Sequence, residues 1–210
     1  MSGWTRLQAW SRQTAGLDLT TTQLEALQAY IDLLLTWNRK VSLVSQQDVD
    51  DILVKHVADS LFAVAHCSGA TRIADLGSGG GFPGVVVAIL QPQARVCLLE
   101  SRGSKASFLE EVCRRLQLAN CAVYHGRIED AGRSPEHAGS YDLAVSRALA
   151  DIDELRRLAG PLLTVDGKLL AMRAQSNDGD ETDLAYSLPD GSPRRLTFLR
   201  PRMLHVKRFT

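Results

Sequence analysis

The sequence predicts an α/β fold in which a mostly parallel β-sheet carries helices on both faces. From residue 72 onward, short apolar segments alternate with segments of helical periodicity, as in repeated strand–helix units. These short segments are apolar throughout rather than alternating, which is typical of strands buried on both faces of a parallel sheet. A glycine-rich loop, residues 74–84 (ADLGSGGGFPG), follows the first of them.

The first 70 residues are predicted to be helical. Apolar residues recur at the three/four spacing of one buried face over 4–38 and again over 50–66. Residues 20–22 (TTT) supply possible N-caps, and Glu25 stands three residues after Thr22, as in a capping box. We expect residues 1–70 to form a helical cap on a domain formed by residues 71–210, the two being integrated into one unit.

Beyond the cap, the same patterns place each element in order. Strands are predicted at 72–76, 95–100, 121–126, 141–146 and 167–173, and helices at 84–90, 105–118 and 151–163. Residues 175–195 are polar and contain Gly and Pro, so we expect a long connection or a mobile flap there. The segments 196–200 and 203–209 are expected to pair as a closing antiparallel hairpin.

Composition and charge exclude several classes of protein. The 210 residues are 45% hydrophobic, which suits a full core, and the longest apolar run is too short to span a bilayer. The four cysteines lack CxxC spacing and the start does not read as a signal peptide, so we expect a cytoplasmic protein without a bound metal. The formal net charge is zero. The basic stretch 194–210 is either solvated or a local face suited to structured RNA.

The glycine-rich loop fits two ligand-binding patterns. Residues 79–84 (GGGFPG) fit the GxGxxG fingerprint of dinucleotides, and residues 75–81 (DLGSGGG) fit the DxGxGxG pattern of S-adenosylmethionine (SAM) methyltransferases. In both, glycine lets backbone N–H groups approach a ligand at the carboxyl end of a strand. An NAD(P)-dependent oxidoreductase and a SAM-dependent methyltransferase therefore both remain open, with a cradle formed by Gly77, Gly79 and Gly81.

Charge favours SAM over a dinucleotide. A pyrophosphate needs bare N–H groups without a nearby carboxylate, whereas SAM carries an ammonium and a sulfonium that Asp75 would attract. Glu100 ends the second predicted strand, where an acid can accept both ribose hydroxyls of an adenosine. The segment 126–129 (GRIE) follows the third predicted strand, and we expect the adenine edge to meet the chain there.

The end of the fourth predicted strand, residues 146–150 (SRALA), is where groups that face the methyl acceptor are expected. It lacks the [DNS]-P-P-[YFW] tetrapeptide of exocyclic-amine methylation, and no nearby cysteine could attack pyrimidine C5. Ring nitrogens, oxygens and targets other than nucleic acid remain. Guanine N7 fits the lack of an obvious base, because its lone pair needs no deprotonation. Arg147 is a candidate to hold the target nucleotide or the SAM carboxylate, and the alternative is an ion pair at the strand end.

Several blocks of sequence together resemble one family. They are WN at 37–38 with Leu43 and Ser45, KH at 55–56 with DSL at 59–61, DLGSGGGFPGVVVAI at 75–89, LLESRGSKASFL at 98–109, GRxE at 126–129 and SRA at 146–148. With them the chain resembles the bacterial small-subunit rRNA methyltransferase G family, formerly named glucose-inhibited division protein B. The resemblance implies the class I SAM-dependent methyltransferase (Rossmann-like) fold and methylation at N7 of one guanine, position 527 of 16S rRNA. It also implies SAM contacts at Gly77, Phe82, Ile128, Glu129 and Arg147.

The residues that would contact RNA are less well defined. His56, Asp59, Lys105, Arg127 and Arg173 are candidates, but His56 and Asp59 would equally well form a hydrogen bond that fixes the cap on the sheet. The chain also departs from the usual family pattern, which has Asn and Thr where Ser42 and Val44 stand, Lys-Arg where Lys105-Ala106 stand, and Lys-Gly where Arg173-Ala174 stand.

The expected partner is 16S rRNA, either naked, in the small ribosomal subunit or in an assembly intermediate. We expect a monomer that binds neither DNA nor membrane. The alternatives are the NAD(P)-dependent oxidoreductase, a SAM methyltransferase of another substrate, and a SAM-binding sensor without catalysis.

Overall fold

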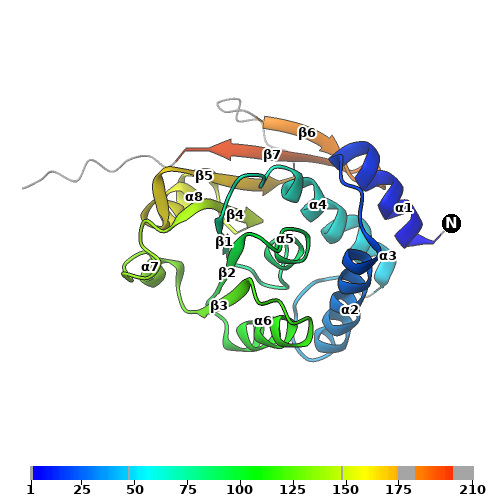
Figure 1. The fold of residues 1–210 in the computed structure, drawn as a ribbon, viewed down its shortest axis with the longest axis horizontal. Helices are drawn as coiled ribbons and strands as arrows, with labels where there is room; N and C mark the ends of the chain where they lie inside the picture. Colours follow the sequence, from blue (N-terminus) through cyan, green and yellow to red (C-terminus); the bar gives the residue numbers. More distant parts are fainter. Residues whose placement is uncertain (1, 47, 148, 175–182, 201–210) are drawn as a thin grey trace, which may run out of the picture.

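A computed structural model describes residues 2–46, 48–147, 149–174 and 183–200. Their strands form one sheet with the order β3-β2-β1-β4-β5-β7-β6 (Figure 1). The strands are β1 (Arg72–Leu76), β2 (Arg95–Glu100), β3 (Cys121–His125), β4 (Tyr141–Arg147), β5 (Leu163–Arg173), β6 (Asp183–Ser187) and β7 (Pro193–Leu199). β1 to β5 run parallel, while β7 is antiparallel to both β5 and β6. The predicted fold class is confirmed.

Helices cover both faces of this sheet. They are α1 (Gly3–Trp10), α2 (Thr21–Asn38), α3 (Val49–Ile52), α4 (Ala58–Ala65), α5 (Gly84–Leu90), α6 (Gly103–Arg115), α7 (Ile128–Ala131) and α8 (Ile152–Ala159). α4, α5 and α6 lie on one face, with α1 to α3 outside them, and α7 and α8 lie on the other (Figure 1). In the part of the chain that the structure describes, none of the helices is long and apolar enough to cross a bilayer.

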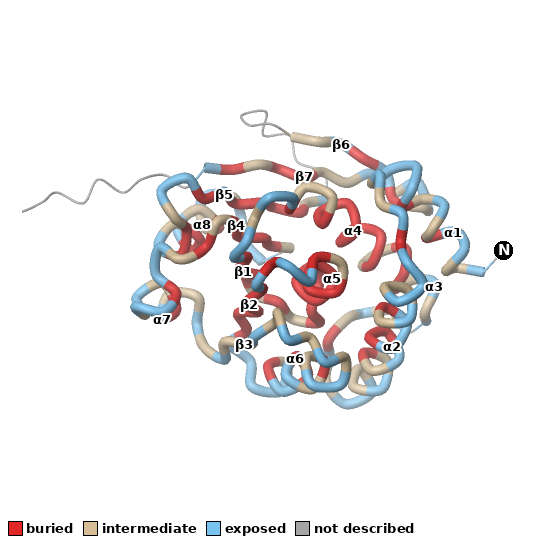
Figure 2. Tube along the Cα trace, in the orientation of Figure 1, coloured by how far each residue is buried: buried red, intermediate tan, exposed pale blue. Residues whose placement is uncertain are grey.

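The cap helices share a core with the sheet. Leu27, Ile31 and Leu34 of α2 belong to the same buried cluster as Val85 of α5 and Leu98 of β2. α5 is buried along nearly its whole length (Figure 2). This burial explains why a segment with three consecutive valines is helical, since tertiary packing overrides the modest helix propensity of β-branched residues. A smaller cluster under α7 and α8 fills the other face.

The predicted helix over residues 4–38 is interrupted. Gly16 adopts φ +67, and the Leu17 N–H closes back onto the Ser11 carbonyl, as at a helix C-terminus that ends on a left-handed glycine. A new helix then starts at Thr20, whose side chain and that of Gln23 form a reciprocal capping box. Thr20 is thus one of the predicted N-caps, whereas the capping box predicted at Thr22 and Glu25 was wrong by two residues.

The C-terminal hairpin is not the predicted one. The predicted strand at 196–200 exists within β7, but its partners are β5 and β6. β6 lies inside the segment 175–195 that was predicted to be a connection. Alternating Leu184, Tyr186 and Leu188 was the period-two signal that the polar composition obscured. The other predicted strand, 203–209, lies outside the described residues.

Candidate active site

A cavity of about 430 Å³ opens at the carboxyl ends of the central strands. Its lining comes from the loops after β1, β2, β3 and β4, beside the point where the strand order reverses between β1 and β4. In an open α/β sheet this position is the usual ligand site. The lining residues are Gly77, Gly79, Leu99, Glu100, Ser101, Arg102, Lys105, Gly126, Arg127, Ile128, Glu129, Arg147, Leu149 and Leu158.

The glycine loop presents backbone to this cavity at two positions. Gly77 and Gly79 line it with φ values of +70 and +55, a conformation that favours glycine. A Cβ at Gly77 would lie 2.7 Å from Leu149 Cδ1, so a side chain there would collide with another residue of the cavity lining. Gly81 differs, because a Cβ there would meet Val85 and the Tyr30 hydroxyl inside the protein rather than a ligand.

Asp75 does not face the cavity. Its side chain is fully buried, and Oδ2 accepts a hydrogen bond of 3.1 Å from the Gly84 N–H at the start of α5. Because side chains alternate along a strand, Asp75 points toward α5 while its neighbours point to the opposite face. Burial raises the pKa of Asp75 to about 7, and the nearby Glu100 adds to the rise. Asp75 thus anchors the loop from behind, and any effect on a bound cation acts through space.

Glu100 lies at the floor of the cavity in a fixed orientation. Oε2 accepts from the Gly79 N–H at 2.9 Å and Oε1 from the Arg102 N–H at 2.8 Å. Only 6% of the residue is exposed. Each carboxylate oxygen keeps lone-pair capacity for a further donor, so the predicted contacts to two ribose hydroxyls are compatible with this geometry.

The rest of the cavity wall is rich in cations. Arg102, Lys105, Arg127 and Arg147 line it together with the acids Glu100 and Glu129. Ile128 and Glu129 begin the short helix α7, next to Gly126. Residues predicted to contact SAM, from three strand ends, therefore line the same cavity. Lys105 and Arg127, which were predicted to contact RNA, also line it.

Arg147 ends β4 and is held from behind by the cap. Its Nε lies 3.2 Å from Asp59 Oδ2, Nη2 donates to the Lys55 carbonyl at 3.0 Å, and Nη1 donates to His56 Nδ1. The ion pair predicted as an alternative role for Arg147 is thus present, and so is the hydrogen bond between cap and sheet predicted as an alternative role for His56. Asp59 is only 2% exposed, so in this conformation it supports Arg147 instead of reaching RNA.

His56 is a neutral link between the glycine loop and Arg147. Its ring stacks on Phe82 with centroids 4.9 Å apart, which places Phe82 behind the cavity wall. Since a guanidinium can only donate, His56 Nδ1 must accept from Arg147 and Nε2 must carry the proton toward Gln46 Oε1. Burial, followed by the charge of Arg147, lowers the pKa of His56 to about 3.

This depressed pKa makes a testable contribution to stability. His56 binds a proton in the unfolded chain below about pH 6.5 but stays neutral when folded, so its contribution is lost as the pH falls toward 3. We expect the stability advantage of the wild type over His56→Gln to shrink by about 2 kcal/mol between pH 7.5 and pH 5. Urea unfolding of both proteins at the two pH values measures this difference.

The comparison with a variant is needed because Asp75 acts in the opposite direction. Its raised pKa contributes stability that is present at low pH and lost as the pH rises through 7. That contribution is common to both proteins and cancels in the difference. The exposed His125→Gln serves as control, and a difference for His56→Gln that is independent of pH would contradict the burial of a neutral imidazole.

Comparison with known proteins decides the family. The family model described as rRNA small subunit methyltransferase G matches residues 23–201. The chain belongs to this family. It is similar to the ribosomal RNA small subunit methyltransferase G of Desulfitobacterium hafniense, with 34% identity over 95% of this chain and 80% of that protein. The corresponding protein of Moorella thermoacetica is 36% identical over 83% of this chain and 73% of its own length.

Solved structures agree on the fold. An O-methyltransferase from Bacillus cereus superposes with a TM-score of 0.57 at 18% identity, covering 94% of this chain and 98% of that one. A methyltransferase from Geobacter sulfurreducens gives 0.55 at 12% identity, covering 83% and 87%. The predicted family and class are confirmed, and the protein is a SAM-dependent methyltransferase. The alternative of an NAD(P)-dependent oxidoreductase finds no support.

Two residues that lie behind Arg147 were not predicted as part of the site. Tyr186 of β6 donates its hydroxyl to Asp59 Oδ1, and Arg194 Nε lies 3.9 Å from Asp59 Oδ2. Both belong to the hairpin that the sequence placed elsewhere. Arg173, predicted as an RNA contact, ends β5, pairs in register with Arg195 of β7 and does not line the cavity.

Proposed function

We propose that this enzyme transfers a methyl group from SAM to N7 of a single guanine, position 527 of 16S rRNA, in the small ribosomal subunit or an assembly intermediate. SAM supplies an electrophilic methyl on its sulfonium. This donor would be held by Gly77, Gly79, Glu100, Ile128 and Glu129. The basic residues of the cavity wall would attract the RNA backbone.

The observation that carries the choice of N7 is the chemistry missing from the cavity lining. Among the described residues, no cysteine lines it. The carboxylates of the lining, Glu100 and Glu129, are the residues expected to hold the donor, and the nearby His56 has both ring nitrogens engaged. A thiolate nucleophile is therefore lacking among the described lining residues, and none of the lining carboxylates is assigned to deprotonate the acceptor. Guanine N7 needs neither, because its lone pair is available at neutral pH.

The transfer then requires alignment and electrostatic support. The cavity residues would have to hold the bound donor and the acceptor in register, and none of them would form a covalent bond to the methyl group. Effective concentration and oriented charge supply the rate enhancement in such a site. Arg147 contributes fixed N–H donors at the cavity wall, while Leu99, Leu149 and Leu158 exclude water from its apolar side.

The test is the position of the methyl group. The protein is incubated with labelled SAM and small subunits from cells that lack this modification, and digested RNA is analysed by mass spectrometry. We expect one 7-methylguanosine per subunit, at position 527. Label at another atom or nucleotide would leave the methyltransferase activity established but would refute guanine N7 at position 527 as the methyl acceptor. Parallel reactions with naked 16S rRNA identify which form of the substrate is preferred.

A further inference from the structure

We propose that Asp59 and Tyr186 are positioning residues that hold Arg147 so that its remaining N–H groups grip an oxyanion of the bound reactants. The inference rests on the proposed function, because it assumes that Arg147 acts in methyl transfer. It assigns a role to the β6–β7 hairpin, whose described residues do not line the cavity.

Geometry supports a fixed direction for the guanidinium. Arginine has five N–H donors, and the contacts to Asp59, His56 and the Lys55 carbonyl use one on each nitrogen. Within the described residues, one N–H on each terminal nitrogen is left over. Arg147 also lines the cavity, and 19% of its side chain is exposed. Two N–H groups at a cavity wall can donate to the oxygens of a carboxylate or a phosphate.

Charge makes Asp59 indispensable to this arrangement. Arg194 approaches from β7, and neutral His56 offers no compensating charge. Among the described residues, Asp59 is the carboxylate that forms an ion pair with the buried guanidinium. Burial lowers the pKa of Arg147, and the Asp59 carboxylate is the largest influence that opposes it. The position of Arg147 therefore depends on the orientation of a single carboxylate.

That orientation is fixed by Tyr186. Asp59 Oδ2 faces Arg147 while Oδ1 accepts from the Tyr186 hydroxyl, so the carboxylate cannot rotate without breaking one of the two contacts. Tyr186 is itself immobilised, because its ring stacks on Phe62 with centroids 3.8 Å apart and an interplanar angle of 12°. Arg194 is its cross-strand partner. A chain of contacts thus runs from the hairpin through α4 to the end of β4.

A double-mutant cycle tests the inference. Rates of methyl transfer are measured at saturating SAM for wild type, Asp59→Asn, Arg147→Ala and the double variant, whatever atom accepts the methyl. We expect Asp59→Asn to slow the wild type about 30-fold but the Arg147→Ala variant less than about 3-fold, because residues that act as one unit are non-additive. An equal loss in both backgrounds would overturn the inference.

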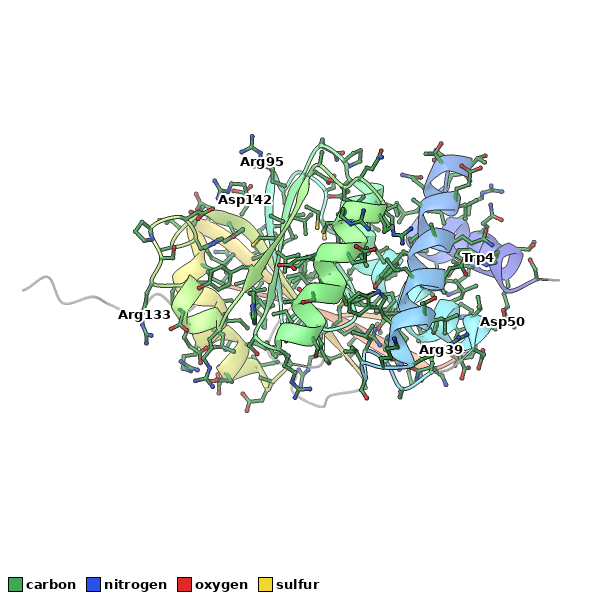
Figure 3. The ribbon with its side chains drawn as sticks, turned by 90° about the horizontal axis from the view of Figure 1, so that it is seen from below. Trp4, Arg39, Asp50, Arg95, Arg133 and Asp142 are labelled. Carbon is green, nitrogen blue, oxygen red and sulfur yellow. The ribbon has the colours of Figure 1, made fainter. Side chains whose placement is uncertain are left out.

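Tyr186→Phe provides a second arm that keeps the ring stack and removes only one hydroxyl. Tyr141→Phe is the matched control, because Tyr141 is also buried and its hydroxyl is bonded to His137 Nδ1 at 2.6 Å. Asp142, the next residue in the chain, lies with Arg95 at the end of the sheet where β2 and β4 begin, which is the end opposite to the cavity (Figure 3). We expect similar stability losses in both, with kcat about 5-fold lower only in Tyr186→Phe. Equal kcat values, with SAM affinity and KM for the small subunit also unchanged, would overturn the inference.

Two further measurements identify the oxyanion. Calorimetric SAM affinity of Tyr186→Phe falls if Arg147 holds the carboxylate of the donor, whereas KM for the small subunit rises if it holds an RNA phosphate. Either result supports the positioning role of Tyr186. If SAM affinity, KM for the small subunit and kcat are all unchanged in Tyr186→Phe, that role is refuted. If Asp59→Asn does not fold, Tyr186→Phe replaces it in the cycle. Product analysis of the wild type tests the guanine assignment separately, so the two proposals can fail independently.

Discussion

Gly77→Val is expected to abolish SAM binding while the protein remains folded. Gly77 combines a φ of +70 with a Cβ direction that leads to Leu149 Cδ1 at 2.7 Å. A valine would strain the backbone by about 1–2 kcal/mol and place two methyl groups where the donor must approach the loop. We expect the SAM dissociation constant to rise more than about 100-fold, which corresponds to nearly 3 kcal/mol. Isothermal titration calorimetry measures it directly.

The backbone strain must be separated from the steric block. Gly16 has nearly the same φ, +67, but a Cβ there meets nothing within 4 Å, and it lies in the cap between α1 and α2. Gly16→Val should therefore lose similar stability and bind SAM as the wild type does. If Gly77→Val is folded and binds SAM with unchanged affinity, the glycine loop is not the donor site.

Arg147→Ala is expected to lower turnover by about 100-fold, the effect typical of removing a preorganised donor from an active site. Among the described residues, Arg147 alone both lines the cavity and contacts Asp59 and His56 of the cap. Its loss removes the guanidinium fork and also the support behind the wall. Single-turnover rates at saturating substrate report this change, and rates within about threefold of wild type would refute the role of Arg147.

The same variant is expected to lose stability, because it leaves Asp59 buried without its main counter-ion. Losing one partner of a buried pair costs about 3–5 kcal/mol. The cost should be at the low end here, since Tyr186 still donates to Asp59 and Arg194 lies 3.9 Å away. The double variant with Asp59→Asn, which removes the orphaned charge, should recover part of it in urea unfolding. Arg147→Lys keeps the charge without the fork and tests whether geometry matters.

Much of the fold was predictable because its signals are local. The parallel strands and three of the helices between them followed from apolar runs and helical spacing within about ten residues, and their observed bounds differ by only a few positions, while the short helix α7 was not predicted. The glycine pattern located the donor loop, and the acid at the end of β2 located Glu100 in the cavity. The errors fell where composition hid the period, as in β6, or where a single left-handed glycine ended a helix, as at Gly16.

The sequence by itself determined the order of the elements, the glycine loop and the family, because each is encoded in contiguous residues. Only the tertiary structure decided which side chains face the cavity. Asp75 and Phe82 turn away from it, whereas Lys105 and Arg127 reach it. It also decided that Asp59 and Tyr186, 127 positions apart, meet behind Arg147. No local period specifies such a contact, because it depends on how separate elements pack together.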